Sequence, residues 1–134
     1  MSAMNEQSRA AARAVDEARL WRRMMDMARF GATPAGGVNR AAFSPEDIQA
    51  RKLLIEWAAE FGFSTASDEI GNLYVRRAGT TDEAPAVTGS HLDSQPKGGK
   101  FDGAYGVVGG FEALEAIERA GVETRRPIEV VAWS

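Results

Sequence analysis

The chain has 134 residues, which is the length of one domain or of a part of one. Its 16 basic and 19 acidic residues leave a net charge of −3, which excludes a basic nucleic-acid-binding surface as the main function. The chain has no cysteine, no apolar run of the ~18 residues that a membrane helix needs, and no secretory signal in its first fifteen residues. We therefore expect a protein of the reducing cytoplasm.

The first segments predict an amphipathic helix followed by a loop. Between residues 9 and 30, apolar side chains such as Leu20, Met24 and Met27 recur at spacings of four and three. The charged residues among them are expected to face solvent. Residues 31–40 contain three glycines and one proline, which regular structure does not tolerate. Because long loops in compact domains often carry function, this loop is a candidate part of the site.

A second helix has a clear start signal. Ser44 is a good N-cap, Pro45 suits the first helical position, and Asp47 completes a capping box. Gly62 is expected to end the helix. Its predicted buried stripe consists of Ile48, Leu54, Ile55, Trp57, Ala58 and Phe61.

Short apolar runs predict the strands that follow. Residues 63–67 and 73–77 are expected to form two strands joined by a tight reversal at residues 68–72. Residues 86–89 are short and apolar, which is typical of a buried strand.

The last third of the chain indicates the fold class. Residues 103–120 predict a helix between the strand at 86–89 and a nearly all-apolar strand at 128–133, which we expect to be covered on both faces. Two such strands are expected to be parallel neighbours in a three-layer α/β/α mixed sheet, an α/β fold. Ligands of such sheets bind at the carboxyl ends of strands. The predicted site therefore includes residues 90–102 and whatever follows Trp133.

The densest cluster of polar side chains follows the strand at 86–89. His91 and Asp93 are two residues apart on a chain leaving a strand, so their side chains point to one side. An imidazole beside a carboxylate is what a metal ligand and its orienting partner require. Asp102 can approach them, because two glycines let the chain turn back. This donor set suits zinc, manganese, cobalt or nickel. Two plainer interpretations stay open: a His-x-Asp pair without a metal, and Asp102 as the N-cap of the next helix.

Four segments resemble, in the same order, the carbamoylase branch of the M20 metallopeptidase-like amidohydrolases. They are residues 31–40, residues 70–73 (Ile-Gly-Asn-Leu), residues 88–103 (beginning Thr-Gly-Ser-His-Leu-Asp) and residues 127–133 (Pro-Ile-Glu-Val-Val-Ala-Trp). This branch includes N-carbamoyl-L-amino-acid hydrolases, beta-ureidopropionases and allantoate amidohydrolases. The resemblance implies a zinc-peptidase-like catalytic domain that hydrolyses carbon–nitrogen bonds of small ureido or N-carbamoyl substrates.

The resemblance implies a role for each matching residue. His91 matches a histidine that binds one metal ion, and Asp102 matches the carboxylate that bridges two. Asp93 matches the acid that orients His91. The implied cofactor is a pair of divalent ions, zinc or alternatively manganese, cobalt or nickel.

Three further residues are candidates for the substrate-binding part of the site. Gln95, followed by Pro96, resembles the carbamoylases rather than the related exopeptidases of the same family. Asn39 and Arg40, at the end of the glycine-rich loop, are candidates for lining the site. The alternative for these two is a loop that simply packs on the sheet edge.

The chain also departs from the family that it resembles. In the family, the strand matching residues 128–133 continues into Asn-Glu-Glu-Gly, which supplies the general base and a further metal ligand. The chain stops at Ser134. The general-base glutamate and the lid domain, which dimerises in the family, are therefore expected to be absent, and residues 1–134 are expected to be the N-terminal part of a catalytic domain. A related exopeptidase and an inactive fragment with a binding or scaffolding role are the alternatives.

Overall fold

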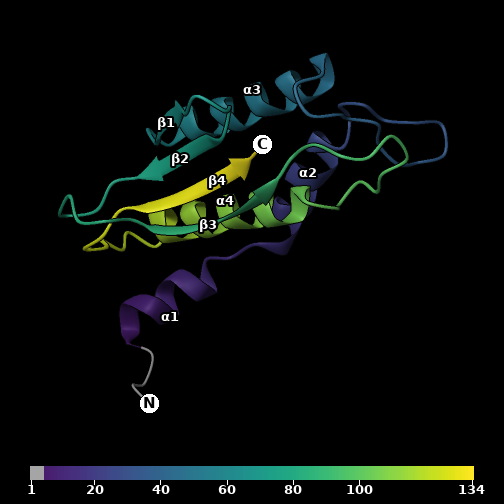
Figure 1. The fold of residues 1–134 in the computed structure, drawn as a ribbon. Coiled ribbons are helices and arrows are strands. Elements are labelled where there is room, and N and C mark those ends of the chain that lie inside the picture. Colours follow the sequence, from purple (N-terminus) through teal and green to yellow (C-terminus); the bar gives the residue numbers. More distant parts are fainter. Residues whose placement is uncertain (1–4) are drawn as a thin grey trace.

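The structure is a computed structural model that describes residues 5–134, shown as a ribbon in Figure 1. The first four residues of the stretch inspected for a secretory signal lie outside this range. The described elements, in order, are α1 (Glu6–Arg13), α2 (Glu17–Met27), α3 (Pro45–Glu60), β1 (Ser64–Ser67), β2 (Leu73–Arg77), β3 (Ala86–His91), α4 (Ala104–Arg119) and β4 (Ile128–Trp133). Within residues 5–134, no helix has the length and apolar character needed to cross a membrane.

The four strands form one mixed sheet in the order β1-β2-β4-β3. The hairpin partners β1 and β2 are antiparallel, and so are β2 and β4. β3 and β4 run parallel, with Ala86 opposite Ile128 and His91 opposite Trp133. The predicted parallel neighbours, joined through α4, are thus confirmed.

One face of the sheet carries the core. Val75 of β2 and Val130 of β4 are opposite each other and belong to one apolar cluster with α2, α3 and α4. Trp57 of α3 lies 5.8 Å, between ring centroids, from Phe111 of α4, so these two helices cover the same face. The mixed α/β class is confirmed, and residues 5–134 supply two of the expected layers.

The other face of the sheet is open, which corrects two burial predictions. Residues 86–89 are exposed rather than buried, with Val87 52% exposed, because β3 lies at the sheet edge. In β4 the central residues are buried, but Trp133 is 44% exposed and meets Tyr74 on the uncovered face.

The predicted first helix is divided into α1 and α2. Asp16 ends the continuity, because its carboxylate accepts a hydrogen bond from the backbone N–H of Arg19 at 2.9 Å and so caps a new helix. In α3, the predicted cap is confirmed, with Ser44 accepting from the N–H of Asp47. Ile48 and Ile55 are 44% and 38% exposed, so the buried stripe is narrower than predicted.

The expectation that the charged residues of α2 face solvent is wrong for two arginines. Arg19 forms ion pairs with Glu112 at 2.5 Å and with Glu115 at 2.8 Å, and all three side chains are at most 10% exposed. Arg23 also pairs with Glu115, and its guanidinium lies 4.7 Å from the ring centroid of Phe111. Mutual charge neutralisation lets these residues be buried between α2 and α4.

Replacing Glu115 with glutamine is expected to destabilise the fold. The carboxylate of Glu115 is fully buried and faces Arg19, Arg23 and Arg119, so its loss leaves buried positive charge without its partner. We expect Glu115→Gln to lower the free energy of unfolding by about 3–5 kcal/mol, measured by urea denaturation. Glu118→Gln on the same helix removes a pair whose glutamate is 44% exposed and should cost about 1 kcal/mol or less. Equal losses for the two variants would show that the buried ion pairs of Glu115 do not stabilise the fold more than an exposed pair does.

The same carboxylate predicts a loss of stability in acid. Burial alone would raise the pKa of Glu115, but hydrogen bonds from Arg119 and Arg23 and the charges of Arg23 and Arg19 outweigh it and lower the pKa below its usual 4.5. A pKa lowered by folding means that the contribution is complete above pH 4.5 and is lost as the pH falls through the folded-state pKa. The difference in unfolding free energy between the unaltered chain and Glu115→Gln should therefore shrink below pH 4.5. A difference that stays constant down to acid pH would refute this assignment.

Candidate functional site

His91 lies at the carboxyl end of β3 with its ring partly exposed. Its Nδ1 atom lies 2.9 Å from the backbone oxygen of Asp93 and 3.4 Å from the Asp93 carboxylate oxygen Oδ1. Both neighbours are acceptors, so they favour the tautomer that carries its proton on Nδ1. This leaves the lone pair of Nε2 available to a metal ion, which is the arrangement found around metal-binding histidines.

Asp102 lies directly before Gly103, the N-cap of α4. In the described part of the chain, its exposed carboxylate makes no hydrogen bond or ion pair. The N-cap of α4 is Gly103, and no side chain caps the helix, so the N-cap interpretation of Asp102 is wrong. The carboxylate is thus uncommitted at the N-terminus of a helix, where the helix dipole favours a negative charge.

Gly103 brings these two parts of the site together. A Cβ atom placed on Gly103 would lie 2.5 Å from Nδ1 and 2.6 Å from Nε2 of His91. The residue that follows Asp102 therefore touches the imidazole. That the side chains of His91 and Asp102 share one metal ion stays a prediction.

The donor set fits a metal ion in chemistry but is small. One imidazole nitrogen and a free carboxylate suit zinc and its neighbours. Within residues 5–134, no group of three His, Cys, Asp or Glu side chains is placed to hold an ion. Because a stable catalytic site usually has about three protein ligands, this chain provides part of one.

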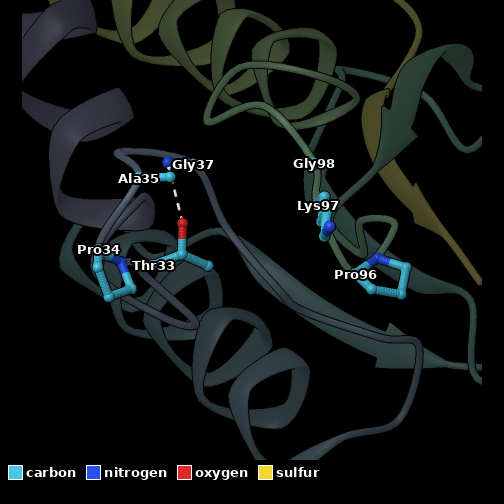
Figure 2. Close-up of a pocket in the computed structure, with 7 residues that line it drawn as sticks. All are labelled: Thr33, Pro34, Ala35, Gly37, Pro96, Lys97 and Gly98. Atoms are coloured by element: carbon cyan, nitrogen blue, oxygen red, sulfur yellow. Dashed lines mark hydrogen bonds between the residues drawn. The ribbon is translucent and has the colours of Figure 1, made fainter.

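The glycine-rich loop at residues 31–40 is paired with the segment that follows His91. Val38 and Gly98 exchange two backbone hydrogen bonds of 3.0 Å, and the hydroxyl of Ser94 accepts from the N–H of Arg40 at 2.9 Å. Figure 1 shows both loops side by side beyond the end of the sheet. A cavity of about 650 Å³ lies between them, and Figure 2 shows its two walls facing each other. The lining residues are Thr33, Pro34, Ala35, Gly37, Pro96, Lys97 and Gly98.

Arg40 does not line an open surface, contrary to one of the two interpretations of this loop. Only 1% of Arg40 is exposed, and its guanidinium donates to the backbone oxygens of Leu92 at 2.7 Å, Phe30 at 2.7 Å and Met27 at 3.0 Å. Burial lowers the pKa of Arg40, and the negative charges of Asp47 and Asp93 oppose this. The residue is a structural anchor that ties the loop to α2 and to the segment after β3.

The other two loop candidates stay candidates. Asn39 is exposed, and its backbone N–H donates to the oxygen of Gly31 at 2.7 Å. Gln95 is also exposed, and its backbone oxygen accepts from the hydroxyl of Ser94 at 2.8 Å. Among residues 5–134, no hydrogen bond uses either side chain, so both can contact a ligand.

Sequence analysis did not identify the contacts that hold the end of β4. The amide oxygen of Asn72 accepts from the backbone N–H of Ser134 at 2.8 Å, and the amide nitrogen donates to Asp68 at 2.8 Å. Hydrogen bonds from Asn72 and Tyr74 lower the pKa of Asp68. Since His91 is opposite Trp133, Ser134 leaves the sheet at the carboxyl end of the parallel strands, where the imidazole also lies. The only signal for this role was that Asn72 lies in one of the four resembling segments.

The chain is similar to hydrolases of carbon–nitrogen bonds. It is 42% identical to an N-carbamoyl-L-amino-acid amidohydrolase from Rhizobium meliloti over 91% of this chain and 30% of that protein. It is 36% identical to a ureidoglycolate hydrolase from Oryza sativa subsp. japonica over 90% of this chain and 25% of that protein. An amidase of the hydantoinase/carbamoylase family from Burkholderia multivorans has a crystal structure that matches 89% of this chain and 29% of its own, with 52% identity and a TM-score of 0.87.

These comparisons confirm the resemblance inferred from the four segments, although no protein-family model matches the chain. The chain spans about 30% of the length of the Rhizobium meliloti and Burkholderia multivorans proteins.

Replacing Arg40 with methionine tests its role as an anchor. The variant keeps most of the apolar stem but leaves three buried or partly buried backbone oxygens without their donor. We expect the free energy of unfolding to fall by roughly 2–4 kcal/mol in urea denaturation. Arg9→Met, which removes an exposed pair with Glu6, should change it by about 0.5 kcal/mol or less. An Arg40→Met chain as stable as the Arg9→Met chain would show that Arg40 is dispensable for the fold.

Proposed function

We propose that this chain, a homologue of the hydantoinase/carbamoylase-family amidases over about 30% of their length, supplies part of a metal-dependent site for hydrolysis of carbon–nitrogen bonds. The proposed substrates are N-carbamoyl amino acids or related small ureido compounds. The observation that carries the proposal is the environment of His91. Its Nδ1 faces two acceptors of Asp93, while within residues 5–134 no hydrogen bond or ion pair holds the carboxylate of Asp102.

The proposed metal-binding residues are His91 and Asp102. Zinc is the first choice for this donor set, with manganese, cobalt and nickel as alternatives, and two ions are proposed for the complete enzyme. A bound ion of this kind polarises the substrate's carbonyl oxygen and lowers the pKa of a bound water molecule. In the same proposal, Asp93 acts on the imidazole rather than on the substrate.

The chain's own residues prepare these ligands before any ion binds. In the neutral ring, the two acceptors of Asp93 favour the proton on Nδ1, so the lone pair lies on Nε2, where it can bind an ion. Asp102 can bind an ion without first breaking another contact, because no ion pair or hydrogen bond holds its carboxylate among the described residues. No residue of the chain is proposed as the general base, which is expected from a glutamate outside it.

The complete enzyme is proposed to be a cytoplasmic homodimer whose lid domain selects the substrate. Overall hydrolysis of an N-carbamoyl amino acid consumes one water molecule and yields the amino acid, carbon dioxide and ammonia. The carbamoylase assignment is preferred over an exopeptidase because the matching relatives are named as amidohydrolases and amidases. An inactive chain with a binding role is the second candidate, favoured by the absence of a third ligand within residues 5–134.

Zinc binding and ammonia release by the same chain test the proposal. We expect a single zinc ion to bind at pH 7 in calorimetry, and His91→Ala or Asp102→Ala to weaken binding by about tenfold or more, because each removes a ligand. Asp82→Ala, in an exposed loop away from the site, is the matched control and should bind zinc as the unaltered chain does. The chain with zinc, manganese or cobalt should release no ammonia from N-carbamoyl amino acids. Residues 5–134 hold no group of three ligands, and no residue of the chain is proposed as the general base.

Two outcomes would change this account. If His91→Ala binds zinc as tightly as the unaltered chain, the metal assignment is wrong. If metal-dependent ammonia release occurs and disappears in Asp102→Ala, the chain holds a more complete site than the one proposed.

A further inference from the structure

The backbone at Gly103 has a conformation that side chains avoid. Its dihedral angles are φ 68° and ψ −53°, and the N–H of Ala104 donates to the backbone oxygen of Asp102 at 2.7 Å. This is the rare form of the three-residue γ-turn, which is strained for L-amino acids. Strained turns persist where the surrounding structure requires them, and they gather at functional sites.

The imidazole of His91 occupies the space that a side chain at position 103 would need. A Cβ atom there would come within 2.6 Å of both ring nitrogens, far inside van der Waals contact. Three other glycines with positive φ, at positions 36, 62 and 121, would place a Cβ in open space. Position 103 therefore requires glycine for two reasons: the backbone has a positive φ, and the imidazole leaves no room for a Cβ atom.

We infer that Gly103 is a positioning residue, which seats the imidazole of His91 against the turn that carries Asp102. Asp93 holds the Nδ1 edge of the ring, and the bare Cα of Gly103 provides the surface on which the ring rests. The ring thereby lies against the peptide turn whose first residue is Asp102. The role of this contact in metal binding rests on the proposed function. The contact between the ring and Gly103 does not depend on metal binding.

Seating the ring has a chemical consequence for ligand binding. A partly exposed histidine at a strand end can otherwise rotate about its side-chain bonds, and ordering it on metal binding costs free energy. A ring that is fixed beforehand avoids that cost, and the γ-turn at Gly103 fixes the backbone that carries Asp102 next to it. Gly103→Ala should therefore weaken zinc binding about tenfold or more without removing any ligand.

A double-mutant cycle separates ring contact from backbone strain. The four chains are the unaltered chain, Gly103→Ala, His91→Ala and the double variant, each unfolded in urea at one protein concentration. The strain of a positive φ is present in both backgrounds, but the clash with the ring exists only where His91 is present. We expect Gly103→Ala to lower the folding equilibrium constant roughly tenfold more in the presence of His91 than in its absence.

Gly121→Ala is the matched control for strain. It lies at the other end of α4 with φ 65°, and nothing lies within 4 Å of its Cβ position. Its effect should be the same with and without His91. If Gly103→Ala also has the same effect with and without His91, the inference is wrong.

The only histidine of the chain gives a second, independent readout by NMR. In the unaltered chain, the imidazole Hε1 should show a nuclear Overhauser contact with the Hα protons of Gly103, and nitrogen shifts should show the proton on Nδ1. If Gly103→Ala fails to fold, this contact decides: its absence from the unaltered chain refutes the seating. Should the unaltered chain show the contact and a non-additive cycle but bind no zinc, the proposed function fails and the seating stands.

Discussion

The parallel pairing of β3 with β4 is the constraint on which the candidate site depends. It places His91 opposite Trp133, so the chain segments after both strands leave the sheet at the same end. The pairing requires α4 to cross back over the sheet, and Gly110 permits this crossing, since a Cβ there would lie 3.1 Å from a methyl group of Val130. The N-terminus of α4, with Asp102 before it, consequently lies at the end of the sheet where His91 lies.

Buried charge fixes the position of that returning helix. Glu112 and Glu115 lie on α4 and pair with arginines of α2, while Arg40 ties the glycine-rich loop to the segment after β3. These groups are solvated in the unfolded chain, so their burial contributes less to stability than to a single arrangement of α2, α4 and the loops. The ligand candidates lie between elements that the arginines hold in place.

The sequence predicted the elements better than their surroundings. Capping at Ser44, the hairpin through residues 68–72 and the strand at 128–133 follow from local chemistry, and the structure has them within one or two residues. The break at Asp16 was missed because an N-cap aspartate looks like any other charge in an amphipathic repeat. The burial of Arg19 could not be predicted, since its partner is 93 residues away in the chain.

The candidate site was predictable to the extent that it is local. The spacing of His91 and Asp93 correctly indicated that they would be neighbours, because two residues at a strand end share a side. Whether Arg40 faces a ligand or backbone oxygens depends on how two distant loops pair, which no local pattern encodes. The role of Gly103 depends likewise on a ring twelve residues earlier in the chain.

The central claim is that His91 is a metal ligand through Nε2 and that the remaining protein ligands of this chain are oxygen atoms. X-ray absorption spectroscopy of the chain with less than one equivalent of zinc tests it most directly. The account predicts the multiple-scattering pattern of one imidazole with a zinc–nitrogen distance of roughly 2.0–2.1 Å, together with oxygen neighbours only. A spectrum without imidazole scattering, matching hydrated zinc or zinc bound by carboxylates alone, would contradict it.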